Sequence, residues 1–305
     1  MQTPGMRIHH LNCVSACPLG GLLMDGFSKK LHGRLASHCL LLEASDSLVL
    51  IDTGYGLRDV ANPRSRLDPV FLSMLQPELR EEMTARRQIE ALGFRADDVR
   101  HIVLSHLDFD HAGGLDDFPA ATVHLLDSEV MSATAQASVL DRMRYRPEQW
   151  SLRSAWRTYA GPVGETWKGF ECVRDLPGLP PEVLMVPLLG HTLGHSGVAI
   201  QRDSGWLFYA ADAYFYHGEM RQAPVCPPGL RAYQVMMEKD RAARLGNQER
   251  LRNLAHADST VTVFCAHDVR ELERLSGRSS KEPAVRQPHA DVSAPEMTAA
   301  RAASF

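Results

Sequence analysis

A dense group of potential metal ligands lies in the segment SHLDFDHAGG, residues 105–114. Four of six consecutive residues there carry imidazole or carboxylate groups: His106, Asp108, Asp110 and His111. Alternate residues of an extended chain point the same way, so the first two can reach one ion, and the last two, beyond a turn, can face a second. A solvated polar loop with a helix cap is the alternative, but the flanking leucine, phenylalanine and glycines argue against it. The pattern predicts a site for divalent metals.

More ligand-type side chains follow predicted strands further along the chain. Two histidines lie in the loop GHTLGH (190–195), an aspartate follows the apolar run 206–211, and a histidine follows the strand 261–265. These residues are His191, His195, Asp212 and His267. Each one alone is more typical of a cap or a turn. Their repeated placement at strand ends predicts that they gather at one edge of a sheet, where α/β proteins build their sites.

The elements that must position these side chains alternate between strands and helices. We predict strands at 38–43, 48–51, 99–104, 122–126, 183–188, 197–201, 206–210 and 261–265, and helices at 84–92, 128–137 and 247–257. The first two strands read as a hairpin, and this mixture favours a layered α/β fold with mixed sheets. We expect one domain over residues 1–276, with helical insertions near 57–82 and 140–182. A disordered tail is expected over 277–305, which is rich in Ser, Pro and Ala.

Composition narrows the classes of function. The 305 residues are 44% hydrophobic, enough for a large core, and a net charge of -4 offers no basic surface for nucleic acid. No apolar run is long enough to span a membrane, and the N-terminus lacks a secretory signal pattern. The six scattered cysteines are therefore expected to be reduced thiols of a cytoplasmic protein. A redox or metal role for the close pair Cys13 and Cys17 is the alternative.

Five features, in this order along the chain, carry a resemblance to a known family. They are the D-T-G turn at Asp52–Gly54, the motif at 106–111, the loop at 190–195, Asp212 and His267. Over residues 36 to 270 the chain resembles the metallo-β-lactamase-fold metallo-hydrolase superfamily, with a variant H-x-D-x-D-H motif and closest likeness to its lactonase-like branch. The resemblance implies an enzyme with an αββα sandwich, mixed β-sheets and a binuclear metal site at one edge of the sandwich.

The resemblance also implies a role for each ligand. One ion would be bound by His106, Asp108 and His195. The second would be bound by Asp110, His111 and His267, and Asp212 would bridge the two ions. His191 would be structural, and Asp52 would orient a histidine ligand. Zinc is the usual metal of the family. Asp108, however, stands where the family has a histidine, and the similar flavodiiron oxygen reductases, which use iron, show such an exchange. The extra carboxylate makes the cluster more neutral and a weaker Lewis acid, which makes the bridging water harder to deprotonate. A carboxylate in place of an imidazole also favours harder ions, so iron or manganese is the alternative.

The expected reaction is hydrolysis of a carboxylic ester or lactone by a water or hydroxide that bridges two divalent ions. Asp110 is the candidate that holds this water and moves its proton. Tyr214 is the candidate hydrogen-bond donor to the developing oxyanion, with Tyr216 as the other option. Similar lactone-hydrolysing enzymes use a tyrosine near this place, but Phe215 occupies the offset at which it is expected.

Three other functions stay open. The first is an iron-dependent oxidoreductase, which Asp108 suggests. The second is a hydrolase of thioesters or phosphoesters, which the same metal chemistry can cleave. The third is a binding protein that kept the fold without its metals. The aromatic residues of segment 140–182, Trp150, Trp156, Tyr159 and Trp167, either wall an apolar pocket or anchor that segment or a dimer contact. We expect a small-molecule substrate and neither nucleic acid nor membrane as a partner; a homodimer is left open.

Overall fold

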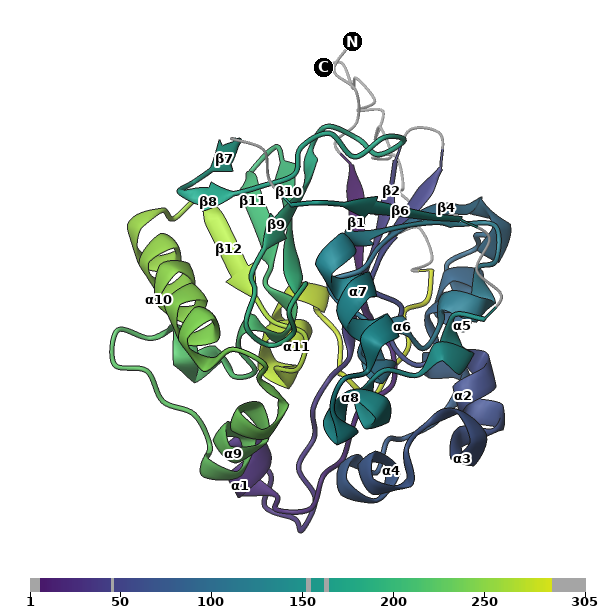
Figure 1. The fold of residues 1–305 in the computed structure, drawn as a ribbon, viewed down its shortest axis with the longest axis vertical. Coiled ribbons are helices and arrows are strands. Elements are labelled where there is room, and N and C mark those ends of the chain that lie inside the picture. Colours follow the sequence, from purple (N-terminus) through teal and green to yellow (C-terminus); the bar gives the residue numbers. More distant parts are fainter. Residues whose placement is uncertain (1–5, 45–46, 152–154, 162–164, 287–305) are drawn as a thin grey trace, which may run out of the picture.

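Two mixed β-sheets pack face to face between outer layers of helices (Figure 1). The computed structural model describes residues 6–44, 47–151, 155–161 and 165–286. The first sheet has the strand order β1 (Arg7–Asn12), β2 (His38–Glu43), β3 (Leu48–Ile51), β4 (Val99–Val103), β5 (Thr122–Leu126) and β6 (Ala155–Tyr159). The second has the order β12 (Val261–Phe264), β11 (Gly205–Tyr209), β10 (Ser196–Arg202) and β9 (Val183–Pro187). In the first sheet β3 to β6 are parallel, and in the second only β11 and β12 are.

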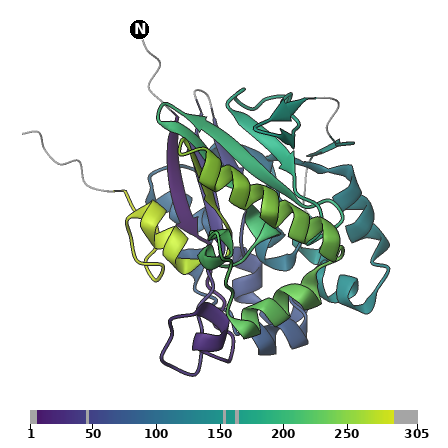
Figure 2. The same cartoon turned by 90° about the vertical axis from the view of Figure 1, so that its left-hand side faces the viewer.

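The helices are mostly short. They are α1 (Leu22–Asp25), α2 (Leu57–Ala61), α3 (Pro63–Arg66), α4 (Pro69–Leu75), α5 (Ala85–Ala91), α6 (Phe109–Ala112), α7 (Asp127–Ala135), α8 (Val139–Arg144), α9 (Pro228–Met237), α10 (Arg241–Ala257) and α11 (Val269–Ser276). A two-stranded hairpin is formed by β7 (Thr166–Trp167) and β8 (Phe170–Glu171). The longest helix, α10, begins at the Asp240 carboxylate, which accepts the Ala243 N–H, and lies across the outer face of the second sheet (Figure 2).

Alternation along the strands builds the layers. One side of each strand faces the opposite sheet, and Val103 of β4 meets Val198 and Leu207 there. The other side faces helices: Ile102 packs in the same cluster as Ile89 of α5. On the second sheet Phe208 and Val263 pack with Leu251 of α10. This arrangement is an αββα sandwich and confirms the predicted fold.

Segment 140–182 differs from the prediction of short helices and loops. It contains α8, but β6 pairs in parallel with β5 and completes the first sheet. β6, with the sequence AWRTY, is an edge strand of the first sheet, and all of its side chains are partly or fully exposed. It therefore lacks the apolar run that marks the central strands. Residues 152–154 and 162–164 of this segment lie outside the described residues.

The sequence predicts disorder from residue 277, but residues 277–286 belong to the folded part of the chain. Ala284 is 2% exposed, and its N–H donates to Gln88 Oε1 at 2.8 Å. The carbonyl of Ser280 accepts from Asn12 Nδ2 at 2.6 Å. Residues 277–286 therefore pack on the first sheet and α5, while 287–305 lie outside the described residues.

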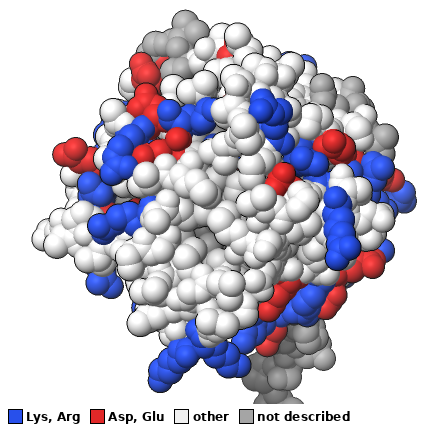
Figure 3. All heavy atoms as spheres, turned by 60° about the horizontal axis from the view of Figure 1, so that its bottom comes forward, with Lys and Arg blue, Asp and Glu red and all other residues white. Residues whose placement is uncertain are grey.

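One face of the molecule is largely uncharged. It lies at the bottom of Figure 1, where α1, α4 and α9 meet, and Figure 3 shows the charged side chains mostly around its edge. Its large apolar side chains are partly exposed, with Leu19 at 53%, Val70 at 57% and Met236 at 43%. Among the described residues no helix combines the length and the apolar character needed to cross a membrane.

Candidate metal centre

The ends of five strands bring the predicted ligands to one edge of the sandwich. The 106–111 motif leaves β4 and enters α6, while Asp52 follows β3 with a left-handed backbone (φ 53°). The 190–195 loop joins β9 to β10, and Asp212 and His267 follow β11 and β12. Every one of these side chains is buried, and Asp110 is the most accessible, at 9%.

The Asp212 carboxylate lies at the centre of the cluster. Its oxygens are 3.2 Å from His111 Nε2, 3.1 Å from His267 Nε2 and 3.8 Å from His106 Nε2. Asp110 Oδ2 is 3.8 Å from His267 Nε2. Ligand atoms about 2.1 Å from a tetrahedral zinc lie about 3.4 Å from one another, so these spacings fit a bound divalent ion.

The hydrogen-bond network assigns the protons of three histidines. His111 Nδ1–H donates to Asp52 Oδ2 at 2.8 Å, and His267 Nδ1–H donates to the Ala36 carbonyl at 2.7 Å. His106 Nδ1 lies 2.9 Å from Ser105 Oγ, whose own proton goes to Asp52 Oδ2 at 2.7 Å. Each ring therefore turns the lone pair of Nε2 toward Asp212, in the orientation that metal-binding histidines have.

Three buried atoms at the centre of the cluster have no hydrogen-bond partner among the described residues. They are His106 Nε2, His111 Nε2 and Asp212 Oδ1, which form one group of close potential ligands. Buried polar atoms without partners are costly and therefore rare. Lone pairs that converge beside a carboxylate are what a cation binds, so the donor set fits a divalent metal.

The Asp52 carboxylate lies behind the candidate ligands and accepts hydrogen bonds from several groups at this edge of the sandwich. Its carboxylate accepts from the Ser105 N–H and the Tyr209 hydroxyl, both at 2.7 Å, besides the two contacts already given. Burial alone raises its pKa, but the adjacent His111 and the hydrogen bonds outweigh this, and the pKa is lowered. Asp52 is therefore an anion that accepts the His111 Nδ1–H.

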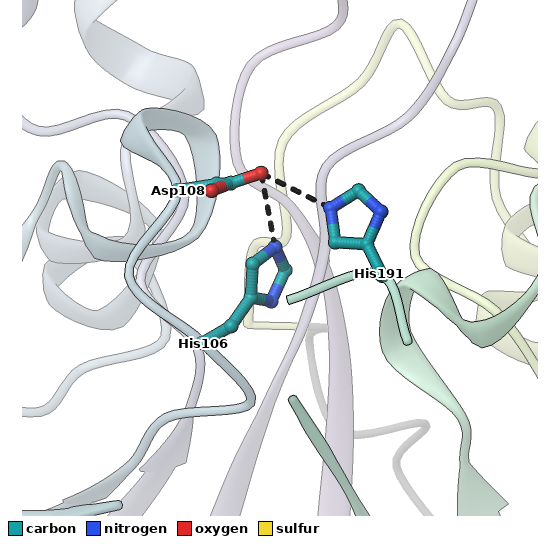
Figure 4. A group of neighbouring side chains, drawn as sticks. All are labelled: His106, Asp108 and His191. Carbon is teal, nitrogen blue, oxygen red and sulfur yellow. Dashed lines mark hydrogen bonds and ion pairs between the residues drawn. The ribbon is translucent and has the colours of Figure 1, made fainter. Parts of the chain in front are cut away.

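The variant residue Asp108 forms an ion pair that the sequence analysis did not foresee. Arg144 of α8 donates to it through Nε (2.6 Å) and Nη2 (2.5 Å), and both side chains are buried. Figure 4 shows the same carboxylate pointing between the rings of His106 and His191, 3.4 and 3.0 Å from their Nε2 atoms. Despite burial, Arg144 and the histidines hold the pKa of Asp108 well below its ordinary value.

The chain is similar in sequence to a family of known proteins. The family model of the metallo-beta-lactamase superfamily matches residues 32–267, more than three quarters of the chain. The chain belongs to this superfamily. A protein of Mycobacterium tuberculosis described as a probable metallo-hydrolase is 37% identical over 266 residues, which are 87% of this chain and 81% of that protein. An N-acyl homoserine lactonase of Bacillus thuringiensis is 25% identical over 76% of this chain and 81% of its own.

Solved structures of the superfamily share the sandwich. The B. thuringiensis lactonase with N-decanoyl-L-homoserine bound superimposes with a TM-score of 0.67 at 20% identity, covering 92% of this chain and 99% of that one. A dizinc quorum-quenching lactonase superimposes with a TM-score of 0.57 at 16% identity, covering 86% and 87%. At these identities the likeness supports the fold alone. The family predicted from the sequence is confirmed.

The two histidines of the 190–195 loop take the opposite places from those expected. His195 donates through Nδ1 to the Leu188 carbonyl at 2.8 Å and accepts the Asp212 N–H at Nε2 at 3.0 Å, so it has no free lone pair. His191 instead lies with His106 and Asp108 in a group of potential ligands. The geometry therefore favours His191 as the ligand-type residue and His195 as a support for Asp212.

Glu129 is a second residue that the sequence analysis missed. Its buried carboxylate accepts from the Leu107 N–H at 3.0 Å, the Thr192 hydroxyl at 2.6 Å and the Gly194 N–H at 3.1 Å. It thereby joins the 106–111 motif to the 190–195 loop. Its position inside a predicted helix gave no signal, because an acidic residue there is usually solvated.

Tyr214 is expected at the candidate metal centre from the sequence, but its side chain points elsewhere. Its hydroxyl donates to the Glu271 carboxyl at 3.0 Å, and its ring packs in the core between the second sheet and α10. Phe215 faces the cluster instead, with its ring 4.7 Å from that of His267 and 5.7 Å from that of His191. An aromatic ring without a hydroxyl therefore lies beside the ligands.

The burial of Glu271 has a consequence for stability. Burial, then the nearby Asp268, raises the pKa of Glu271 to about 8, against 4.5 for an ordinary glutamate. Between these values the folded protein holds a proton that the unfolded chain has released. The free energy of unfolding should therefore fall as pH rises from about 5 to 8, by on the order of 1 kcal/mol per pH unit.

Urea unfolding at pH 5.5, 7 and 8.5 checks this. Glu271→Gln, which cannot titrate, should remove that part of the slope and raise stability at pH 8.5 relative to the unaltered chain. Exposed Glu249→Gln on α10 is the matched control and should leave the slope unchanged. Identical slopes for the unaltered chain and Glu271→Gln would show that this carboxyl is already ionised at neutral pH.

An apolar groove opens on the uncharged face beside the metal centre. Its volume is about 740 Å³, and its walls include Leu19, Met24, Val70, Met74, Tyr233 and Met236. Tyr233 also packs against Phe215, at 5.9 Å between ring centres, so it joins the groove to the cluster. The aromatic residues of segment 140–182 serve elsewhere: Trp150 and Trp167 are buried in two different cores, and Tyr159 stacks on His124.

Proposed function

We propose that the chain is a metal-dependent hydrolase of small lactones or carboxylic esters that carry an apolar acyl chain. The observation that carries this is the buried cluster of Asp110, His111, Asp212 and His267, whose spacings fit a divalent ion and in which His111 Nε2 and Asp212 Oδ1 have no hydrogen-bond partner among the described residues. The apolar groove beside it supports the class of substrate. The 25% identity to lactonases that act on N-acyl homoserine lactones agrees with both.

Zinc is the metal that we propose. Asp108 suggested iron or manganese because a carboxylate favours harder ions than an imidazole does, but the guanidinium of Arg144 binds both of its oxygens and compensates its charge within the same buried pair. The remaining donors, imidazoles and carboxylates, are those of zinc hydrolases. The same compensation removes the reason for an oxidoreductase. When bound, the metal would polarise the scissile carbonyl and lower the pKa of water.

Asp110 is the proposed base. It is the most accessible carboxylate of the cluster and is not held by an arginine, unlike Asp108. From this position it can orient a water molecule and accept its proton. The attack then takes place at the solvent-facing side of the centre, where His267 is also slightly exposed, at 6%.

Tyr233 is the proposed hydrogen-bond donor to the substrate in place of Tyr214. Its hydroxyl group is close enough to the cluster for its pKa to be raised, first by burial and then by Asp110, Asp108 and Asp212. The phenol therefore stays protonated at neutral pH and can donate to the developing oxyanion. Phe215 holds the ring of Tyr233 at the boundary between groove and centre.

Hydrolysis assays with zinc-loaded protein test the proposal. In a series of N-acyl homoserine lactones from butanoyl to dodecanoyl, kcat/KM should rise with chain length by about tenfold or more, because each buried methylene contributes up to about 0.8 kcal/mol. Met236→Glu in the groove should abolish this rise and spare the shortest substrate. Met131→Glu, at an exposed methionine on α7 outside the groove, is the control.

Two results would contradict the proposal. Absence of turnover for every lactone and aryl ester by protein with confirmed metal content would remove the reaction class. Faster turnover of thioesters or phosphoesters than of any lactone would show that the site acts on those substrates instead.

A further inference from the structure

The cluster has a sealed side and an accessible side, and they differ in charge. The sealed side consists of His106, Asp108 and His191, none more than 2% exposed, and Arg144, which is fully buried, reaches into it. The accessible side has Asp110, at 9%, and His267, at 6%, together with His111, and no guanidinium contacts their ligand atoms among the described residues. Asp212 lies between the two sides, 3.1 Å from His267 Nε2 and 3.4 Å from His191 Nε2. The superfamily's dinuclear members hold one ion on each side of such a centre, as the resemblance implied.

Arg144 makes hydrogen bonds around its whole guanidinium group. Besides the two bonds to Asp108, Nη1 donates to the Met237 carbonyl at 2.7 Å, and Nη2 lies 2.8 Å from His191 Nε2. A guanidinium nitrogen can only donate, so His191 Nε2 accepts this hydrogen bond from Arg144. The potential ligand atoms of two residues are thus already engaged by a cation.

The distances leave little room for an ion as well. Asp108 Oδ2 and His191 Nε2 are 3.0 Å apart, and Arg144 Nη2 lies 2.5 and 2.8 Å from them. A metal about 2.1 Å from both atoms would lie within about 4 Å of Nη2, whichever side of the pair it took. A buried dication and a buried guanidinium at that separation repel each other strongly, because the dielectric constant of a buried site is low.

The charges of the side chains also argue against an ion on the sealed side. Asp108 and Arg144 together are neutral, so the sealed side has no net negative charge of its own beyond the shared Asp212. The accessible side adds the carboxylate of Asp110 to that of Asp212, and no arginine of the described residues pairs with either. We propose that the guanidinium of Arg144 replaces one metal of the dinuclear centre, so that the protein binds a single divalent ion through Asp110, His111, Asp212 and His267.

Metal content measures this directly. Protein stripped of metal, dialysed against excess Zn²⁺ or Mn²⁺ and then desalted, should retain about one ion per chain by elemental analysis. With Mn²⁺, its electron paramagnetic resonance spectrum should be that of an isolated ion. Arg144→Met should bind a second ion and give the spectrum of a coupled pair, because Asp108 and His191 are released. Arg142→Met, at an exposed arginine of the same helix, should still bind one.

The double variant Asp108→His/Arg144→Met keeps the test decisive if Arg144→Met does not fold. It removes both members of the buried pair, so no charge is left unpaired. It should bind two ions. Two tightly held ions in the unaltered chain would overturn the inference, and so would one ion in a folded double variant.

The inference rests on the metal dependence in the proposed function, but the two fail differently. Protein that binds no metal under any condition, or one ion without any hydrolysis, contradicts the proposed function. Protein that hydrolyses lactones with two ions per chain contradicts only the exchange of a metal for Arg144.

Discussion

Asp110→Asn should lower kcat for lactone hydrolysis by about 10³-fold or more. The amide keeps the shape of the carboxylate but cannot accept a proton, and general-base catalysis typically contributes 10²–10⁴-fold. It also removes one negative charge from the side of the cluster that fits a cation. Since no described arginine or lysine pairs with Asp110, the substitution leaves no buried cation unmatched, and the protein should stay folded.

Measurement of kcat, metal content and the unfolding midpoint on the same preparation separates these effects. Asp97→Asn, at an aspartate whose side chain is 66% exposed, is the control and should behave like the unaltered chain. Turnover within tenfold of the unaltered chain, with metal content unchanged, would exclude Asp110 as the base. Because Asp110 is also a proposed ligand of the ion, turnover is compared at equal metal content, which excess Zn²⁺ restores.

The strands that carry the ligands were predictable because burial on both faces makes them continuous apolar runs. β2, β3 and β5 have the predicted bounds, and β4, β9 and β12 end within one residue of them. Polar side chains that follow such runs stand out in a sequence, since few other positions so close to a core tolerate them. This is why the order of motifs was sufficient to identify the family and its fold.

The arrangement around Asp108 was not predictable from the same signals. Arg144 is 36 residues away in sequence, in a segment with several arginines, and only tertiary packing selects the one that pairs. The charge argument therefore counted an extra carboxylate without its partner. The weaker Lewis acidity that it predicted does not apply to a neutral pair.

The choice between His191 and His195 likewise depended on backbone pairing. The Leu188 N–H donates to the His195 carbonyl at 2.9 Å, which extends the β9–β10 ladder by one pair beyond Ser196 and Pro187. His195 is therefore held against the end of β9, while His191 lies at the tip of the connection and can turn toward the cluster. Spacing alone does not show where a ladder ends.

Asp52→Asn tests whether the network behind the ligands controls the metal. Asp52 accepts four hydrogen bonds, from the Ser105 N–H and hydroxyl, His111 Nδ1–H and the Tyr209 hydroxyl, while an asparagine offers a single acceptor oxygen and adds two donors. Buried donors left without acceptors cost about 1–3 kcal/mol each, so stability should fall by on the order of 3 kcal/mol. Metal affinity should fall 10–100-fold, because His111 loses the partner that orients it.

Denaturant unfolding of the metal-free protein gives the first quantity, and competition with a chromophoric zinc chelator gives the second. Asp258→Asn is the matched control: Asp258 also accepts several hydrogen bonds, from Lys168 and Thr260, but at the exposed end of α10. It should leave metal affinity unchanged. If Asp52→Asn lowers stability yet binds zinc as tightly as the unaltered chain, the orientation of His111 is set by the ion and not by the fold. The cluster would then owe its geometry to metal binding, and the free lone pairs at its centre would no longer be evidence of a site built in advance.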